Sequence, residues 1–154
     1  MIIWLTANSG AGKTLVAKAA QKKFPNIIVL DGDEMRNTIC KGLGFSKEDR
    51  TENNLRIARL ANLLQSQGFA VIVSVIAPYE ELRQKVTEIC HPFWIYVRRN
   101  LPERKDYPYE VPKNPDYVID NTGASKEDAI NQFIGFLEKE EYPDKRFIPP
   151  HGNA

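Results

Sequence analysis

Short apolar runs alternate along the chain with longer stretches whose apolar residues recur at helical spacing. The runs predict five strands, at residues 2–5, 27–30, 71–76, 93–97 and 117–119. The longer stretches predict helices at residues 13–24, 33–40, 46–67, 80–89 and 125–139. Because continuous apolar strands separated by helices are typical of a parallel sheet covered on both faces, we expect an α/β fold. Its architecture would be a three-layer sandwich around a five-stranded parallel sheet.

The helix predicted at residues 46–67 has the clearest pattern. Ser46 and Asp49 form a capping-box pattern at its start, and Gly68 follows its end. Apolar residues repeat between them at helical spacing, namely Ile57, Leu60, Ala61 and Leu64. This pattern predicts a long helix with one apolar face.

Two stretches lack regular patterning. Residues 98–115 are charged and rich in proline, and they connect the last two predicted strands. Residues 142–154 contain proline and glycine and follow the last predicted helix. We therefore predict one domain at residues 1–141 with a short lid-like loop at 98–115. A C-terminal tail, predicted to be loosely packed or disordered, follows it.

Composition and charge narrow the class of protein. The 154 residues are 42% hydrophobic and 27% charged, and 21 Lys and Arg nearly balance 20 Asp and Glu. Proteins that bind nucleic acid normally have a clear basic excess, and no apolar run has the length of a membrane span. We therefore expect a cytoplasmic protein with neither nucleic acid nor membrane as a partner. Cys40 and Cys90 are predicted to be reduced, half-buried thiols rather than a disulfide or a metal pair.

The segment between the first strand and the first helix is typical of a phosphate-binding loop. It reads Ser9-Gly10-Ala11-Gly12-Lys13-Thr14. In such a loop the backbone N–H groups hold phosphate oxygens beside a helix N-terminus, Lys13 reaches the β- and γ-phosphates of ATP, and the Thr14 hydroxyl binds Mg²⁺. Ala7 stands where the usual pattern begins with glycine. The alternative is a plain strand-to-helix turn with an accidental Lys-Thr pair.

Two carboxylates follow the second predicted strand in the sequence Asp31-Gly32-Asp33. Because the carboxyl ends of parallel strands line one crevice, we expect both carboxylates to face the phosphate-binding loop. Phosphoryl transfer needs one carboxylate near the attacking hydroxyl and another near the metal ion. The alternative makes Asp33 a helix N-cap and Asp31 a turn residue, and the two interpretations are compatible.

A second group of residues has the chemistry to bind an anionic nucleotide. Arg36 lies one helical turn beyond Asp33, and Arg50 and Asn53 share one face of the long helix. Guanidinium groups suit phosphate or sulfate oxygens, although a solvated charged face is the commoner role of a single arginine. Phe45 precedes the helix, and it would either pack onto the helix as a hydrophobic staple or stack on a nucleobase.

These motifs, taken in order, resemble the adenylylsulfate kinase family. The resemblance covers residues up to Glu88 and resumes from Tyr107 to Asn121. It rests on the phosphate-binding loop, Leu30-Asp31-Gly32-Asp33, Arg36, Leu43-Gly44-Phe45-Ser46, Glu48-Asp49-Arg50, Glu52-Asn53, Pro78-Tyr79, Arg83, Pro108-Tyr109-Glu110 and Pro115-Asp116. Several motifs in one order are far more specific than a phosphate-binding loop alone.

The resemblance implies a P-loop kinase topology and transfer of the ATP γ-phosphate to the 3′-hydroxyl of adenylyl sulfate. It implies that Asp33 polarises this hydroxyl and that Asp31 assists the metal and its waters, with Lys13 on the phosphates. The acceptor would be held by Arg36, Arg50 and Asn53, with its base stacked on Phe45 and its base edge near the backbone of Ile76. The family is usually homodimeric, so the resemblance also implies a homodimer.

The sequence departs from the family at two places. Ala77 stands where many members carry a serine before the Pro-Tyr pair, so a covalent route through that position is closed and direct in-line transfer is expected. The segment between the last two strands is also shorter than in the family, which removes most of the usual lid. In what is left, Arg98, Arg99, Arg104 and Lys105 would close over the phosphates, and Tyr107 or Tyr109 would offer a ring to the base. The alternative is a solvated basic loop without contact to the substrate. Two alternatives stay open: a kinase of a different nucleotide, such as cytidine diphosphoramidate, and a non-catalytic nucleotide-binding regulator.

Overall fold

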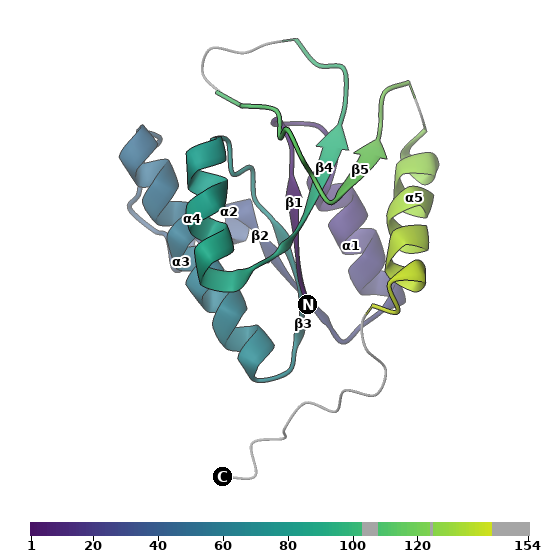
Figure 1. Cartoon of the computed structure of the whole chain (residues 1–154), viewed down its shortest axis with the longest axis horizontal. Coiled ribbons are helices and arrows are strands. Elements are labelled where there is room, and N and C mark those ends of the chain that lie inside the picture. The colour runs from purple at the N-terminus through teal and green to yellow at the C-terminus, as the bar shows by residue number, and fades with distance from the viewer. Residues whose placement is uncertain (103–107, 124, 143–154) are drawn as a thin grey trace.

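A computed structural model describes residues 1–102, 108–123 and 125–142 of the chain. Figure 1 shows a central sheet with helices on both of its faces. The strands are β1 (Ile2–Thr6), β2 (Ile27–Asp31), β3 (Ala70–Ser74), β4 (Phe93–Arg98) and β5 (Tyr117–Asp120). The helices are α1 (Lys13–Lys23), α2 (Gly32–Arg36), α3 (Lys47–Ser66), α4 (Glu80–Cys90) and α5 (Lys126–Lys139).

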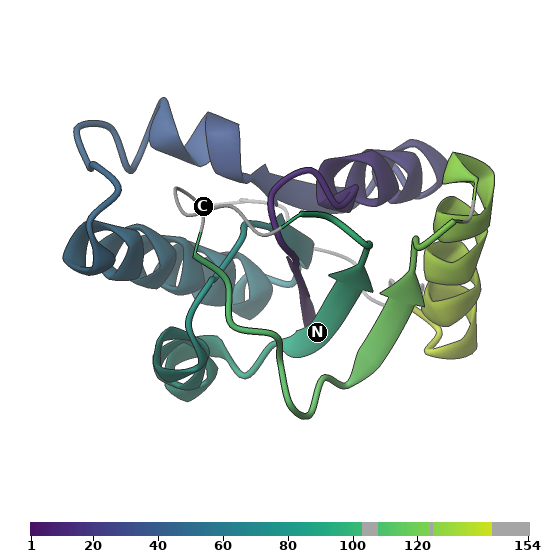
Figure 2. The same ribbon diagram turned by 90° about the horizontal axis from the view of Figure 1, so that it is seen from above.

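The five strands form one sheet in the order β2-β3-β1-β4-β5, and every pair of neighbours is parallel. The predicted α/β fold with a five-stranded parallel sheet is therefore confirmed. Helices α3 and α4 cover one face of the sheet, and α1 and α5 cover the other, as Figures 1 and 2 both show. All strands end at the same edge, so the loops that follow β1, β2 and β3 meet there.

Alternate residues of the central strand β1 build the two halves of the core. Ile3 and Leu5 point toward α1 and α5, where they pack in a cluster that includes Phe133. Ile2 and Trp4 point the other way and pack in the cluster beneath α3 and α4. Because successive side chains of a strand leave opposite faces of the sheet, a strand that is apolar throughout is buried on both sides.

The helix predicted at residues 33–40 is shorter than expected. Helix α2 ends at Arg36, and turns continue the chain to Gly42, which has a φ of 93°. Thr38 Oγ1 donates to the backbone oxygen of Glu34 at 2.7 Å. Cys40 N donates to Met35 O at 2.8 Å, and this bond spans five residues instead of the four of an α-helix. Threonine competes with the helix for its own backbone acceptors, which explains the early end.

The strand predicted at residues 71–76 is also shorter than expected, and β3 ends at Ser74. The carbonyls that follow accept hydrogen bonds from side chains of β1. Trp4 Nε1 donates to Val75 O at 3.0 Å, and Thr6 Oγ1 donates to Ile76 O at 2.6 Å. Residues 75–78 therefore leave the sheet and become a wall beside its carboxyl edge.

The end of the described chain packs against the core. Tyr142 is buried, and its hydroxyl donates to the backbone oxygen of Val71 at 2.9 Å. Tyr142 therefore belongs with the domain rather than with the predicted tail, of which residues 143–154 lie outside the described part. Cys40 and Cys90 are both free and buried. Among the described residues, no helix combines the length and apolarity needed to cross a membrane.

Candidate functional site

The loop between β1 and α1 has the backbone shape of a phosphate-binding loop. Gly10 and Gly12 have φ angles of 82° and 103°, a region that L-residues rarely adopt. A Cβ on Gly12 would lie 3.0 Å from Asn121 Nδ2, which itself donates to Ala11 O at 2.9 Å. The first N–H groups of α1, from Lys13 onward, have no partner inside the helix. They are therefore available to an anion at the helix N-terminus.

The departure at Ala7 does not disturb this loop. Ala7 is fully buried, and it is absent from the positions with positive φ. Because only a left-handed conformation or a close backbone contact requires glycine, alanine is compatible with this position.

A polar cluster lies at the ends of β2 and β3, beside the start of α1. Thr14 Oγ1 donates to Asp31 Oδ1 at 3.0 Å, and Ser74 Oγ lies 3.5 Å from the same hydroxyl. Asp31 is 7% exposed and also caps α2, since its Oδ2 accepts from the N–H of Asp33. The N-cap is therefore Asp31, and the alternative that made Asp33 the N-cap and Asp31 a turn residue is wrong.

Lys13 and Asp33 are left without direct partners in this cluster. Burial of the Lys13 ammonium lowers its pKa below the ordinary value, and the charges of Asp31 and Asp33 partly oppose that shift. Neither Lys13 Nζ nor the Asp33 carboxylate forms a hydrogen bond or ion pair with a side chain that the structure describes. The half-buried ammonium of Lys13 and the exposed carboxylate of Asp33 can therefore both form hydrogen bonds with a ligand between them.

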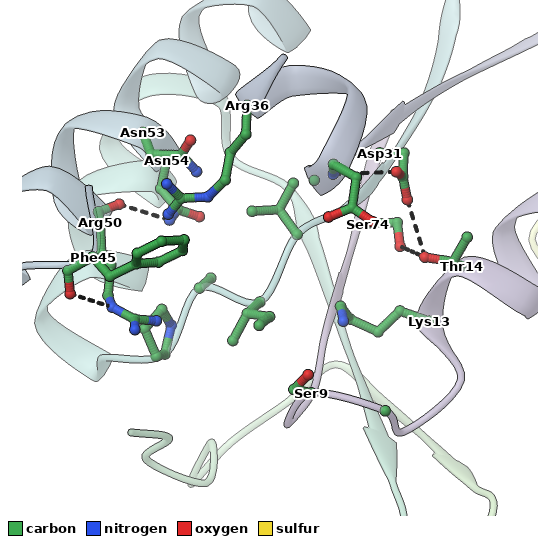
Figure 3. A pocket seen from close by; sticks show the side chains of 17 residues that line it. Ser9, Lys13, Thr14, Asp31, Arg36, Phe45, Arg50, Asn53, Asn54 and Ser74 are labelled. Atoms are coloured by element: carbon green, nitrogen blue, oxygen red, sulfur yellow. Dashed lines mark hydrogen bonds between the residues drawn. The ribbon is translucent and has the colours of Figure 1, made fainter. Parts of the chain in front are cut away.

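One cavity of about 420 Å³ joins the phosphate-binding loop to the predicted acceptor-binding residues. Figure 3 shows Lys13, Thr14 and Asp31 on one side of it, and Phe45 and Arg50 on the other. The lining consists of Ser9, Gly10, Lys13, Thr14, Asp31, Gly32, Asp33, Arg36, Phe45, Arg50, Asn53, Asn54, Ser74, Val75, Ile76, Ala77 and Pro78. The cavity thus brings together the candidate site residues except Ala11 and Gly12, which form the loop behind it.

Two arginines contact the ring of Phe45 at the edge of the cavity. The guanidinium carbons of Arg36 and Arg50 lie 4.4 and 5.4 Å from the centre of its ring, which is 66% exposed. Arg50 Nε donates to Phe45 O at 2.8 Å, and Arg36 Nη1 donates to Gly44 O at 3.0 Å. Because Phe45 is exposed, the hydrophobic-staple interpretation is wrong, and its ring is available for stacking.

Two amides on α3 complete this side of the cavity. Asn53 and Asn54 are each 2% exposed, and Oδ1 of both has no hydrogen-bond partner among the described residues. Asn53 was predicted from the sequence, whereas Asn54 was not. One sequence signal indicated that Asn54 is buried: it continues the apolar stripe of Ile57 and Ala61 by one turn toward the N-terminus of α3. A polar residue on a buried stripe needs a partner.

Arg83 holds the wall at residues 75–78 in place. Its side chain is 4% exposed and pairs with Glu80 Oε2 at 2.7 Å. Arg83 Nη1 donates to Ala77 O at 2.7 Å, and Nη2 donates to the backbone oxygen of Glu110. One guanidinium therefore connects α4, the cavity wall and the segment that precedes β5.

We predict that Arg83→Ala lowers the free energy of unfolding by about 2–4 kcal/mol, because it removes a buried side chain together with its hydrogen bonds to Ala77 O and Glu110 O and its pair with Glu80. Urea denaturation followed by circular dichroism measures this change. Lys85→Ala on the same helix is the matched control. Lys85 and Glu81 form an exposed pair at 3.8 Å, so its loss should cost about 0.5 kcal/mol or less. Equal effects of the two substitutions would contradict the anchoring role of Arg83.

The described part of the predicted lid makes contacts that differ from those expected. Arg98 pairs with Asp120 at 2.7 Å on the surface, whereas Arg99 Nη1 donates to Gly10 O at 3.0 Å in the phosphate-binding loop. Tyr109 is half-buried with its hydroxyl 2.9 Å from Thr6 Oγ1, and its ring stacks on Tyr96, so it does not offer a face to a base. The predicted contacts of Arg104, Lys105 and Tyr107 lie outside the described residues.

Comparison with known proteins agrees with this arrangement. The family model described as adenylylsulphate kinase matches residues 1–107. A probable adenylyl-sulfate kinase of Bacillus subtilis is 36% identical over 167 residues, which cover 90% of this chain and 85% of that protein. The chain belongs to the adenylylsulphate kinase family. An adenylyl-sulfate kinase of Microcystis aeruginosa is 40% identical over 141 residues, covering 74% of this chain and 78% of that protein.

A solved member of the family has the same fold. The Mycobacterium tuberculosis APS kinase, in complex with AMPPNP and APS, superposes with a TM-score of 0.80 at 28% identity. The match covers 89% of this chain and 96% of that one. The predicted kinase of the P-loop class, with ATP-dependent transfer to a hydroxyl group, is therefore confirmed. The alignment with the Bacillus protein, at 167 residues, is longer than this chain of 154, so that relative has residues without a counterpart here.

Proposed function

We propose that the protein transfers the γ-phosphate of ATP to the 3′-hydroxyl of adenylyl sulfate. The observation that carries this proposal is the single cavity that connects Lys13 and Thr14 with Arg36, Phe45 and Arg50. A phosphate donor at one end and an anionic nucleotide at the other would meet between them, next to Asp33. Membership of the family and the names of its relatives support the same reaction.

The polar cluster beside the phosphate-binding loop fits a magnesium ion. Mg²⁺ prefers oxygen ligands, and in nucleotide sites it takes only one or two of them from the protein while phosphates and waters supply the rest. The Thr14 hydroxyl and the Asp31 carboxylate are such ligands, and they already lie 3.0 Å apart. When bound, the ion would neutralise charge on the phosphates of ATP.

Lys13 and Asp33 would carry the chemical step. The Lys13 ammonium would lie against the β- and γ-phosphates, where negative charge develops as the phosphoryl group leaves ADP. The Asp33 carboxylate would accept the proton of the acceptor hydroxyl as the hydroxyl oxygen bonds to the γ-phosphorus. The bond between that phosphorus and the bridging oxygen of ADP breaks in the same displacement. Ala77 has no hydroxyl, so a phosphorylated intermediate at this position is excluded.

The other end of the cavity would bind the acceptor. The base would stack on the exposed face of Phe45, and the wall at Ile76 would contact its edge through backbone groups. Arg36, Arg50 and Asn53 would hold the anionic and polar parts of the nucleotide.

The decisive experiment measures ADP release by the purified protein with ATP, Mg²⁺ and candidate acceptors. Adenylyl sulfate should support turnover with formation of 3′-phosphoadenylyl sulfate, and ATP alone should not. The panel includes cytidine- and uridine-based diphosphates, which test acceptors with a base other than adenine. Turnover of a cytidine acceptor alone would establish the alternative substrate. Nucleotide binding without turnover of any acceptor would establish the regulator.

Arg50→Ala should act through acceptor binding. We predict that it raises the acceptor KM by roughly 10–100-fold and changes kcat much less, since its charge contacts the substrate in both the ground state and the transition state. Initial-rate kinetics with varied acceptor measure this effect, and the KM for ATP should stay unchanged. Arg50→Lys is the matched control, because it keeps the charge but loses the fork that bonds Phe45 O. A collapsed kcat with an unchanged acceptor KM would contradict this role.

We also infer that the protein forms a homodimer. The inference rests on the family resemblance, and a relative from Thiobacillus denitrificans, 32% identical to this chain, is a hexameric APS kinase. Light scattering coupled to size-exclusion chromatography measures the molar mass. A mass near 17.6 kDa at all accessible concentrations would exclude the dimer.

A further inference from the structure

Asn54 has a fixed orientation at the acceptor end of the cavity. It lies on α3 one turn beyond Arg50, and its Nδ2 donates to the backbone oxygen of Arg50 at 2.8 Å. Only the nitrogen of an amide can donate to a carbonyl, so this bond determines which end of the side chain is Oδ1. Rotation of the amide would place two acceptor oxygens against each other. The unpaired atom of Asn54 is therefore an acceptor.

This acceptor lies where the base of the nucleotide would lie. Figure 3 shows Asn54 beside Arg36 and above the ring of Phe45, on the side of the cavity away from Lys13. Asn54 lines the cavity although it is only 2% exposed, and Oδ1 has no partner among the described residues. A buried carbonyl oxygen without a donor is unfavourable, so an N–H or O–H group from a ligand or a water would stabilise it.

We propose that Asn54 reads the base of the acceptor nucleotide by accepting a hydrogen bond from an exocyclic amino group. This inference rests on the proposed function, which places the base on Phe45. Adenine and cytosine carry such an amino group. Their deaminated counterparts, hypoxanthine and uracil, carry a carbonyl oxygen in its place, and that oxygen would face Asn54 Oδ1 with lone pairs on both sides. Asn54 thus selects amino-bearing bases and rejects the deaminated ones.

The test compares adenylyl sulfate with its inosine counterpart in the wild-type protein and in Asn54→Leu. The wild type should favour the amino-bearing substrate in kcat/KM by roughly tenfold or more. Asn54→Leu has the same branched shape but no acceptor, so its kcat/KM values for the two substrates should become nearly equal. Asn54→Ala also removes the acceptor and should likewise make the two values nearly equal, which keeps the test available if the leucine variant does not fold.

Three outcomes would overturn the assignment. Equal kcat/KM for both substrates in the wild type would mean that a water satisfies Oδ1. A preference that persists in Asn54→Leu or in Asn54→Ala would place the discrimination on another group. Turnover of adenylyl sulfate by the wild type reports separately on the proposed function. Without that turnover, the same comparison is made by the binding of cytidine and uridine diphosphates, for which equal affinities would overturn the role of Asn54.

Discussion

Lys13→Ala should lower kcat by about 10²–10³-fold and leave the protein folded. The ammonium group is half-buried in the cavity, and it forms no ion pair with the described residues that its removal would break. Its pKa is lowered by burial, so the charged form is held at a cost that negatively charged phosphates would offset. The substitution therefore removes charge stabilisation from the transferring phosphoryl group rather than a structural contact.

The measurement is a steady-state assay of ADP release, with thermal unfolding of both proteins as a check on folding. Lys18→Ala on the exposed part of α1 is the matched control, because it removes the same charge from the same helix outside the cavity. The control should retain the wild-type kcat. A folded Lys13→Ala protein with normal kcat would contradict the assignment of the phosphate-binding loop.

Asp33→Asn should lower kcat by about 10²–10⁴-fold, because an amide cannot accept the proton of the attacking hydroxyl. The structure sharpens this prediction, since Asp31 rather than Asp33 caps α2. The Asp33 carboxylate also makes no hydrogen bond among the described residues. Its loss should therefore change the free energy of unfolding by about 0.5 kcal/mol or less.

Kinetics and urea denaturation of the same Asp33→Asn preparation separate the two roles. Affinity for ATP, measured by equilibrium binding, should change little. Glu34→Gln is the matched control, because it neutralises a neighbouring exposed carboxylate of α2 and should leave kcat intact. A variant that loses stability while retaining kcat would assign Asp33 a structural role and remove it from the catalytic step.

The fold was accessible from sequence because its elements are encoded locally. Each strand is built on a continuous apolar run, and α2, α3 and α5 carry their own side-chain caps, which are Asp31, Ser46 and Ser125. Errors occurred where a side chain competed with the regular backbone pattern. Thr38 bonds back to Glu34 where α2 was expected to continue, and Trp4 and Thr6 bond the carbonyls where β3 was expected to continue.

By itself the sequence determined the phosphate end of the site, since a strand, a glycine-containing loop and a helix start are consecutive and need no distant partner. At the proposed acceptor end the sequence indicated Arg36, Phe45, Arg50 and Asn53, but only the tertiary structure decided which further side chains face the cavity. It packed the half-buried Tyr109 against Thr6, 103 positions away in the chain, and so removed a ring that the sequence offered to the base. It also placed Asn54 in the cavity with an unpaired oxygen. Such roles depend on which distant groups come into contact when the helices pack on the sheet, and the local sequence pattern does not predict those contacts.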